Sequence, residues 1–290
     1  MRSIFKAVKV CSYCGRKNEE EAFNCFECGT QVANRASRKH ETNPMVASDH
    51  DGEAVEKLTP GYSWGARDAW KCLGMFVGFD FVLDVALTAA AAVSPPFQSW
   101  WRTGAGHLGI SLLYYTVAIL TMLYFARVQT VEGFLKAFGL DTPPSSYIWF
   151  AVVATLAIRA FGHVMIVSGW SPGATTKAMW GFTHAAGLER YLYLAPAFIA
   201  PFGEELFMRG FVYRAFRGSY SVPVSTMLIL AIVTVTHWGQ VHRSWSAAVD
   251  IGTLNVLQCF LRERTGNLRD CVICHLVYNA SGAFTSVLGR

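Results

Sequence analysis

Two adjacent carboxylates, Glu204 and Glu205, are followed by Arg209 in a stretch that is otherwise apolar enough to lie in a lipid bilayer. A charged side chain at the centre of a membrane helix costs roughly 2.5–3.5 kcal/mol on insertion scales, so it normally has a partner or a function. Because residues four apart share a helix face, Glu205 and Arg209 are predicted to form an ion pair. Glu204 points to a different side, where it can face a cavity.

Histidine and amide side chains recur in two of the apolar segments that follow. His237 closes one segment, and His275 and Asn279 lie four residues apart in the last one, on one helix face. Hydrolysis of an acyl bond needs a group that takes a proton from water and donors that stabilise the oxyanion. A lone intramembrane histidine more often forms a hydrogen bond between helices. The whole set instead predicts catalysis inside the membrane.

The composition assigns most of the chain to the polytopic membrane proteins. Of 290 residues, 52% are hydrophobic and 16% are charged, against about 25% charged residues in soluble domains. We predict an all-α membrane domain over residues 67–290, with about seven transmembrane helices of roughly 20 residues each. The predicted segments are 70–93, 107–126, 147–167, 191–216, 223–238, 245–261 and 268–288. No concentrated basic stripe accompanies the net charge of +5, so no nucleic-acid partner is expected.

The distribution of basic residues predicts the orientation of these segments. With the N-terminus in the cytoplasm, the cytoplasmic loops contain more arginine and lysine than the opposite loops, in agreement with the positive-inside rule. The first residues lack an uninterrupted apolar core and a small-residue cleavage site, so we predict no signal peptide. The expected location is the cell (inner, cytoplasmic) membrane, with membrane lipid as a partner.

Four cysteines near the start form two Cys-x-x-Cys-Gly knuckles: Cys11, Cys14, Cys25 and Cys28. This spacing is typical of tetrahedral zinc sites, and a domain this small needs the metal in order to fold. A pair of disulfides is the alternative, and it would require an oxidising compartment. We predict a structural zinc ribbon over residues 1–33, whose binding partner is unknown, and a flexible polar linker over residues 34–66.

The motifs described above resemble those of the CAAX-protease and bacteriocin-processing (CPBP, or Abi) family of intramembrane proteases, over about residues 190–285. They occur in the family's order: Glu204-Glu205-x-x-x-Arg209, then His237, then His275-x-x-x-Asn279. The resemblance implies that Glu204 and His237 activate water, while His275 and Asn279 stabilise the tetrahedral intermediate. The family usually has phenylalanine four residues before the second-motif histidine. Here that residue is Val233, so altered packing beside the site is expected.

The resemblance leaves the role of a metal ion open. Glu204, His237 and His275 could instead bind a catalytic zinc with one open position, as in other zinc hydrolases. The glutamate-and-histidine route is slightly favoured.

The predicted function is that of an intramembrane endopeptidase, which hydrolyses a peptide bond of a membrane-associated protein or peptide near the cytoplasmic face. Whether that substrate is prenylated is left open. The alternative is a non-catalytic membrane protein that binds a partner through its zinc ribbon, for instance in bacteriocin immunity.

Two further pairs of ionisable residues lie inside predicted membrane segments. Asp80 and Asp84 are four residues apart in the first segment, and Arg159 and His163 are four apart in the third. Each pair shares a helix face. We expect these side chains to pair between helices, with a substrate or proton path as the alternative.

Overall fold

The computed structural model describes residues 8–10, 17–19, 64–173 and 176–288. Two short strands, β1 (Val8–Val10) and β2 (Lys17–Glu19), pair in antiparallel register, with Val8 opposite Glu19. The four predicted zinc ligands, Cys11, Cys14, Cys25 and Cys28, lie outside the described residues, as does most of the predicted linker. The zinc ribbon therefore stays a prediction.

From residue 64 onward the regular elements are helices. In chain order they are α2 (Ala66–Val93), α3 (Pro95–Trp101), α4 (Gly104–Ala126), α5 (Val131–Phe138), α6 (Ile148–Val167), α7 (Lys177–His184), α8 (Gly187–Glu205), the π-helix η2 (Leu206–Val212), α9 (Tyr213–Arg217), α10 (Val222–Thr236), α11 (Trp238–Val241), α12 (Trp245–Thr265) and α13 (Leu268–Leu288).

Each of the seven predicted segments contains helix, and the last prediction, 268–288, coincides with α13. Three helices, α2, α4 and α6, are long and apolar enough to cross a membrane. Their surfaces carry exposed apolar side chains such as Phe81, Tyr124 and Trp149, as lipid contact requires. The chain is thus an all-helical membrane protein over this region, and the full count of seven spans stays a prediction.

Four short helices were not predicted from the sequence: α3, α5, α7 and α11. A helix of one or two turns is too short to show a clear apolar period, and it depends on caps instead. Thr130 accepts a hydrogen bond from the Gly133 amide at the start of α5, and Thr176 accepts one from Met179 at the start of α7.

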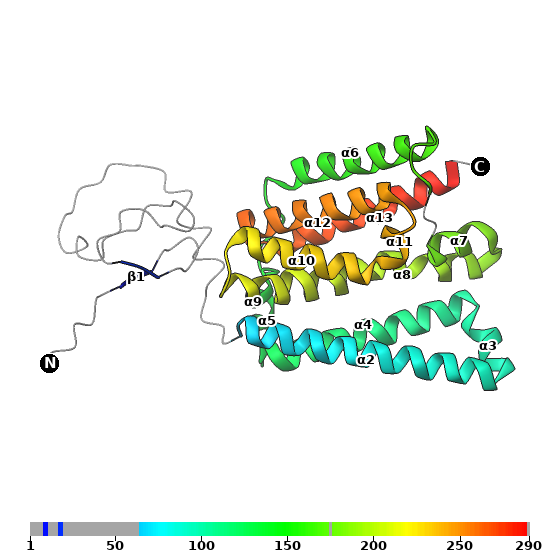
Figure 1. The fold of residues 1–290 in the computed structure, drawn as a ribbon, viewed down its shortest axis with the longest axis horizontal. Coiled ribbons are helices and arrows are strands. Elements are labelled where there is room, and N and C mark those ends of the chain that lie inside the picture. The colour runs from blue at the N-terminus through cyan, green and yellow to red at the C-terminus, as the bar shows by residue number, and fades with distance from the viewer. Residues whose placement is uncertain (1–7, 11–16, 20–63, 174–175, 289–290) are drawn as a thin grey trace.

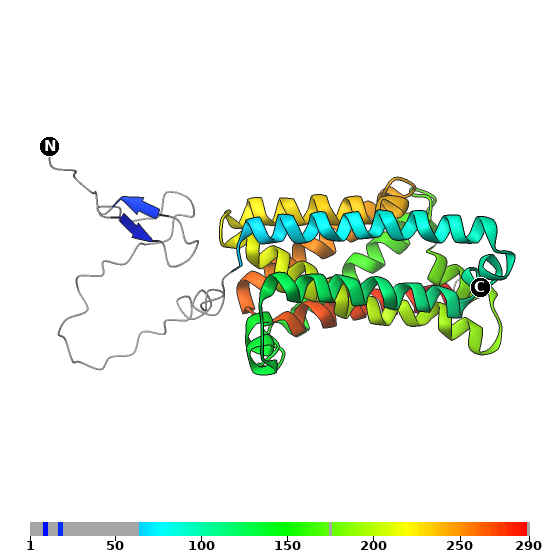
Figure 2. The same cartoon turned by 90° about the horizontal axis from the view of Figure 1, so that it is seen from below.

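The long helices lie side by side along the long axis of the molecule (Figure 1). α2 and α4 form an antiparallel pair joined through α3 at one end (Figures 1 and 2). α8 contacts both α4 and α13, while α12 contacts α6, α10 and α13. Helices far apart in the sequence therefore surround the C-terminal end of α8, where Glu204 and Glu205 lie.

The start of α13 is fixed by a contact between two helix ends. α5 is capped by Gly139 and α12 by Gly266, both with left-handed backbone (φ 66° and 65°). The Leu268 amide donates to the Gly139 carbonyl oxygen at 3.0 Å. A Cβ on Gly139 would lie 2.2 Å from the Gly266 oxygen, so only glycine fits there. This contact anchors the helix that carries His275.

Candidate active site

The two adjacent glutamates lie at a break in helical geometry. Pro201, inside α8, has no amide hydrogen to donate, and the π-helix η2 begins directly after Glu205. Single π turns inside α-helices occur frequently at functional sites. The backbone here therefore departs from regular α-helix on both sides of the pair.

Glu204 faces the interior of the helix bundle. Its side chain is 29% exposed, and its Oε1 atom accepts a hydrogen bond of 2.9 Å from the Tyr115 hydroxyl on α4. A Cβ on Gly203 would lie 2.8 Å from a ring carbon of Tyr115, so this glycine permits the close approach of α4.

Glu205 is fully buried, and one of its oxygens binds three donors. Its Oε1 atom accepts hydrogen bonds from Arg209 Nη1 at 3.2 Å, Gln258 Nε2 at 2.9 Å and His275 Nδ1 at 2.8 Å. Arg209 also donates to the Asn255 side chain on α12. The predicted Glu205–Arg209 ion pair is therefore present, within a buried polar cluster that joins η2, α12 and α13.

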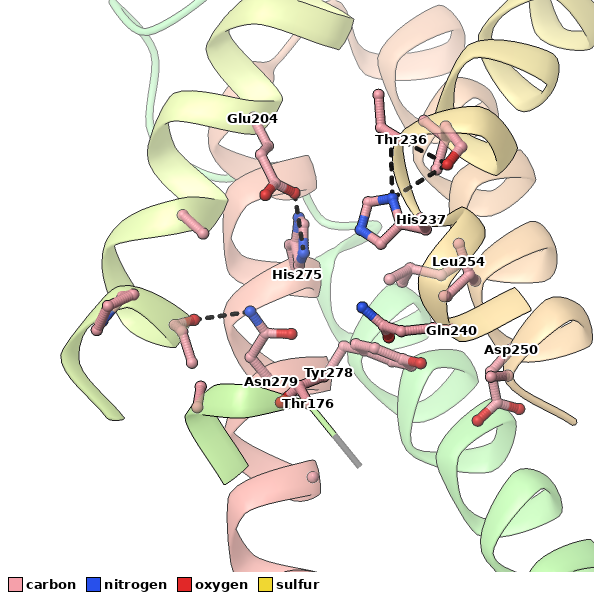
Figure 3. A pocket seen from close by; sticks show the side chains of 18 of the residues that line it. Thr176, Glu204, Thr236, His237, Gln240, Asp250, Leu254, His275, Tyr278 and Asn279 are labelled. Carbon is pink, nitrogen blue, oxygen red and sulfur yellow. Dashed lines mark hydrogen bonds and ion pairs between the residues drawn. The ribbon is translucent and has the colours of Figure 1, made fainter. Parts of the chain in front are cut away.

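In each of the two cavity histidines, His237 and His275, the ring Nδ1 atom contacts an oxygen of the protein. A carboxylate or carbonyl oxygen can only accept, so His275 Nδ1 donates to Glu205 and His237 Nδ1 donates to the Val233 carbonyl at 3.1 Å when it carries the proton. The Thr236 hydroxyl also lies 3.1 Å from His237 Nδ1. Each neutral ring then has Nε2 free as an acceptor. His275 Nε2 lies 3.8 Å from Glu204 Oε2. Figure 3 shows Glu204, His237 and His275 around one space.

Asn279 has a structural partner that the sequence did not reveal. Its Nδ2 atom donates to the Ala197 carbonyl oxygen on α8 at 2.7 Å (Figure 3). In a regular helix that oxygen would accept from the amide four residues later, which belongs to Pro201 and carries no hydrogen. Asn279 thus satisfies the carbonyl that Pro201 leaves free and ties α13 to α8 just before the glutamates. One Nδ2 hydrogen remains for another acceptor.

We expect the substitution Asn279→Ala to lower stability, because it leaves the partly buried Ala197 carbonyl without its protein partner, at a cost of up to about 1–3 kcal/mol. The double variant Asn279→Ala, Pro201→Ala should recover part of that loss, since residue 201 then supplies an amide hydrogen. Thermal unfolding of the two purified variants measures this. Equal melting temperatures for the single and double variants would contradict the assignment.

These side chains line one cavity of about 700 Å³. Its wall includes Glu204, His237, His275 and Asn279, together with apolar groups from α2, α4 and α8. Lys177, which also lines the cavity, lies outside the predicted spans, and partial burial lowers the pKa of its ammonium group. The cavity is large enough for an apolar peptide segment.

The catalytic zinc considered from the sequence would need three ligands in one place. Among the residues that the structure describes, no group of three or more His, Cys, Asp or Glu side chains is arranged to hold a metal ion. Glu204, His237 and His275 share the cavity, but they are not grouped as a ligand set.

The two other ionisable pairs differ in their surroundings. Arg159 pairs with Asp250 on α12, as expected for pairing between helices. Its neighbour His163 is exposed, and so are Asp80 and Asp84 on α2.

The sequence analysis did not identify several side chains that complete the site: Tyr115, Asp250, Asn255 and Gln258. Asn255 and Gln258 are amides three residues apart in an apolar segment and are almost fully buried. The criterion that selected Asn279, a polar side chain at membrane depth, would have selected both. No local pattern points to Tyr115, because tyrosine is common in membrane helices.

The chain was compared with curated proteins, solved structures and models of protein families. No curated protein and no solved structure matched the chain. Residues 186–281, the segment that holds Glu204, Arg209, His237, His275 and Asn279, match the family model described as type II CAAX prenyl endopeptidase Rce1-like.

Proposed function

We propose that this protein is an intramembrane endopeptidase, and that the side chains around the cavity hydrolyse a peptide bond. The single observation that carries the proposal is the arrangement of Glu204, His237 and His275. The Glu204 carboxylate lines the same cavity as the two imidazole rings, and the Nδ1 atom of each ring contacts a protein oxygen. A carboxylate and the accepting Nε2 atom of His237 suit proton transfer from water, and His275 lies beside them as a donor. The match of residues 186–281 to a family of endopeptidases supports the same reaction.

In the first proposed step, a water molecule lies between Glu204 and His237. Glu204 takes one proton from this water, while His237 Nε2 orients it as an acceptor. The water oxygen then forms a bond to the carbonyl carbon of the peptide, and the carbonyl oxygen becomes an oxyanion. Tyr115 donates to Glu204 Oε1 throughout, so the other oxygen of the carboxylate is the one that acts as base.

In the second step the tetrahedral intermediate collapses. The C–N bond breaks and the proton held by Glu204 moves to the leaving nitrogen, giving a carboxylic acid and an amine. In this proposal His275 carries a proton on both ring nitrogens from the start of the reaction: Nδ1 donates to Glu205 Oε1, whose carboxylate balances the charge, and Nε2 donates to the oxyanion. The remaining Nδ2 hydrogen of Asn279 is a second donor on the same helix. In this proposal Asn279 both positions α8 and contributes to the oxyanion site.

A direct test uses the purified full chain in liposomes with a library of membrane-associated peptides, half of them prenylated. Mass spectrometry of the products should show a discrete cleaved bond, and comparison of the two halves shows whether a prenyl group is required. An absence of cleavage across both halves, with protein that is folded by thermal unfolding, would contradict the proposal. The non-catalytic alternative gains no support, since it depends on a ribbon outside the described residues.

We further propose that Cys11, Cys14, Cys25 and Cys28 bind one structural zinc, and that hydrolysis proceeds without a catalytic metal. The paired strands β1 and β2 lie on either side of the first cysteine knuckle in the sequence, which is consistent with a ribbon.

Elemental analysis tests both statements. We expect one zinc per wild-type chain and none after all four ribbon cysteines are replaced by serine, because their spacing is typical of a zinc site and the described residues contain no group of three possible ligands. Stoichiometric zinc in the serine variant would instead indicate a second site, with Glu204, His237 and His275 as the first candidates.

A further inference from the structure

A second polar group lines the cavity apart from the proposed catalytic residues. Arg159 on α6 approaches Asp250 on α12 and Tyr278 on α13, with Nη1 at 3.4 Å from each oxygen. Its guanidinium carbon also lies 4.7 Å from the centre of the Tyr278 ring. All three side chains line the cavity. Figure 3 shows Asp250 on the far side of the drawn space from Glu204.

The surrounding backbone makes room for this ion pair. A Cβ on Gly162 would lie 2.2 Å from an Asp250 oxygen, and a Cβ on Gly282 would lie 3.0 Å from Arg159 Nη2. Two helices therefore have no side chain where the carboxylate and the guanidinium lie. The space is part of the packing of α6, α12 and α13, which makes this a formed site on the cavity wall.

The ion pair leaves hydrogen-bonding capacity unused. Both contacts of Nη1 are longer than the 2.7–2.9 Å typical of charge-assisted hydrogen bonds. Asp250 Oδ1 and Arg159 Nε are buried without a partner. An unpaired buried polar atom carries a free-energy penalty, so such atoms occur where a ligand or a functional movement supplies the missing partner.

The exposed fractions of Arg159 and Asp250 indicate which charge a ligand at this ion pair would carry. The Arg159 side chain is 24% exposed and that of Asp250 is 4% exposed. The guanidinium therefore faces the cavity, while the carboxylate holds it from the buried side. The other cations on the cavity wall already have partners: Arg209 is 2% exposed and bound to Glu205, and Lys177 donates to the Trp101 carbonyl.

We propose that Arg159 is the binding site for a carboxylate of the substrate, with Asp250 and Tyr278 as positioning residues. The proposal rests on the proposed peptidase function and assigns a specificity site to the same cavity. Gly282, beside Arg159, lies seven residues after His275, or about 10 Å along the axis of α13. The bound carboxylate therefore belongs to a part of the substrate a few residues from the bond that is cleaved. It is either the C-terminal carboxylate or an acidic side chain.

The test measures binding, so that it does not depend on cleavage. The full chain carrying Glu204→Gln is placed in nanodiscs with three fluorescent apolar peptides that differ only at their C-terminal residue or terminal group. The first ends in a free carboxylate, the second ends in an amide, and the third ends in an amide but has glutamate as its last residue. We expect the first or the third peptide to bind roughly tenfold or more tightly than the second, as for a hydrogen bond to a charged group. Which of the two it is identifies the source of the carboxylate.

Variants then assign the preference to Arg159. The preference for a carboxylate should disappear with Arg159→Gln and survive in part with Arg159→Lys, which keeps the charge but not the planar fork. The control Arg243→Gln, at an exposed arginine after α11, should leave it unchanged. Equal affinity for all three peptides, or a preference that persists in Arg159→Gln, would overturn the proposal. If both Arg159 variants fail to fold, the proposal is judged from the Glu204→Gln protein alone: equal affinity for the carboxylate and amide peptides overturns it. A carboxylate preference without any cleavage by the wild type would contradict the peptidase function alone.

Discussion

The variant Glu204→Gln is expected to reduce kcat for peptide hydrolysis by about 10²–10⁴-fold, the usual contribution of a positioned general base. Glutamine has nearly the same shape and can still accept from the Tyr115 hydroxyl, so the fold should be retained. It cannot take a proton from water at neutral pH. Initial rates with the purified full chain in liposomes measure the loss.

The matched control is Asp84→Asn, which makes the same chemical change at another carboxylate inside a membrane helix. Asp84 lies exposed on α2 and does not line the cavity. Its variant should therefore keep the wild-type rate. Full activity in Glu204→Gln would contradict the assignment of Glu204 as the base. A comparable loss in Asp84→Asn would mean that the assay reports general damage to the membrane domain.

The second large effect is expected for Glu205→Gln, on stability as well as on rate. Glu205 and Arg209 are 0% and 2% exposed, so removal of one charge leaves the other buried and uncompensated. Breaking a buried ion pair in this way typically costs about 3–5 kcal/mol. We expect a clear fall in the melting temperature of the detergent-solubilised protein. The rate should also fall, because His275 loses the charged partner on its Nδ1 atom.

The double variant Glu205→Gln, Arg209→Met separates the two effects. It removes both charges, so most of the lost stability should return, since apolar replacement of a buried ion pair is often neutral or better. Activity should stay low, because no carboxylate then accepts from His275 Nδ1. If the double variant regained both stability and activity, the pair would have only a structural role.

Most of the long helices could be predicted from the sequence, and so could the main polar side chains of the candidate site. Long apolar segments predict membrane helices directly, and the start of α13 was located to the residue because Asn267 and the basic residues before it interrupt the apolar pattern. Glu205 and Arg209 were paired correctly, since four-residue spacing alone brings such side chains together. Helices α8, α12 and α13 carry too many polar residues, and the apolar helix α10 is too short, for composition alone to establish how many of them span the membrane.

The contacts between helices could not be predicted from the sequence. That Tyr115 would bind Glu204, or that Gln258 would share an oxygen of Glu205 with His275, depends on the packing of helices 50 or more residues apart in the chain. The partner of Asn279 also depends on such packing. The missing amide of Pro201 is evident in the sequence, but nothing local indicates which side chain compensates for it.

The most direct test of the proposed activity compares new protein N-termini in host membranes that contain either wild-type protein or the Glu204→Gln variant at matched abundance. The proposal predicts a set of N-termini present only with the wild type, each from a membrane-associated protein or peptide. The same set of N-termini in both samples, with both proteins folded and equally abundant, would contradict the conclusion that this site cleaves peptide bonds.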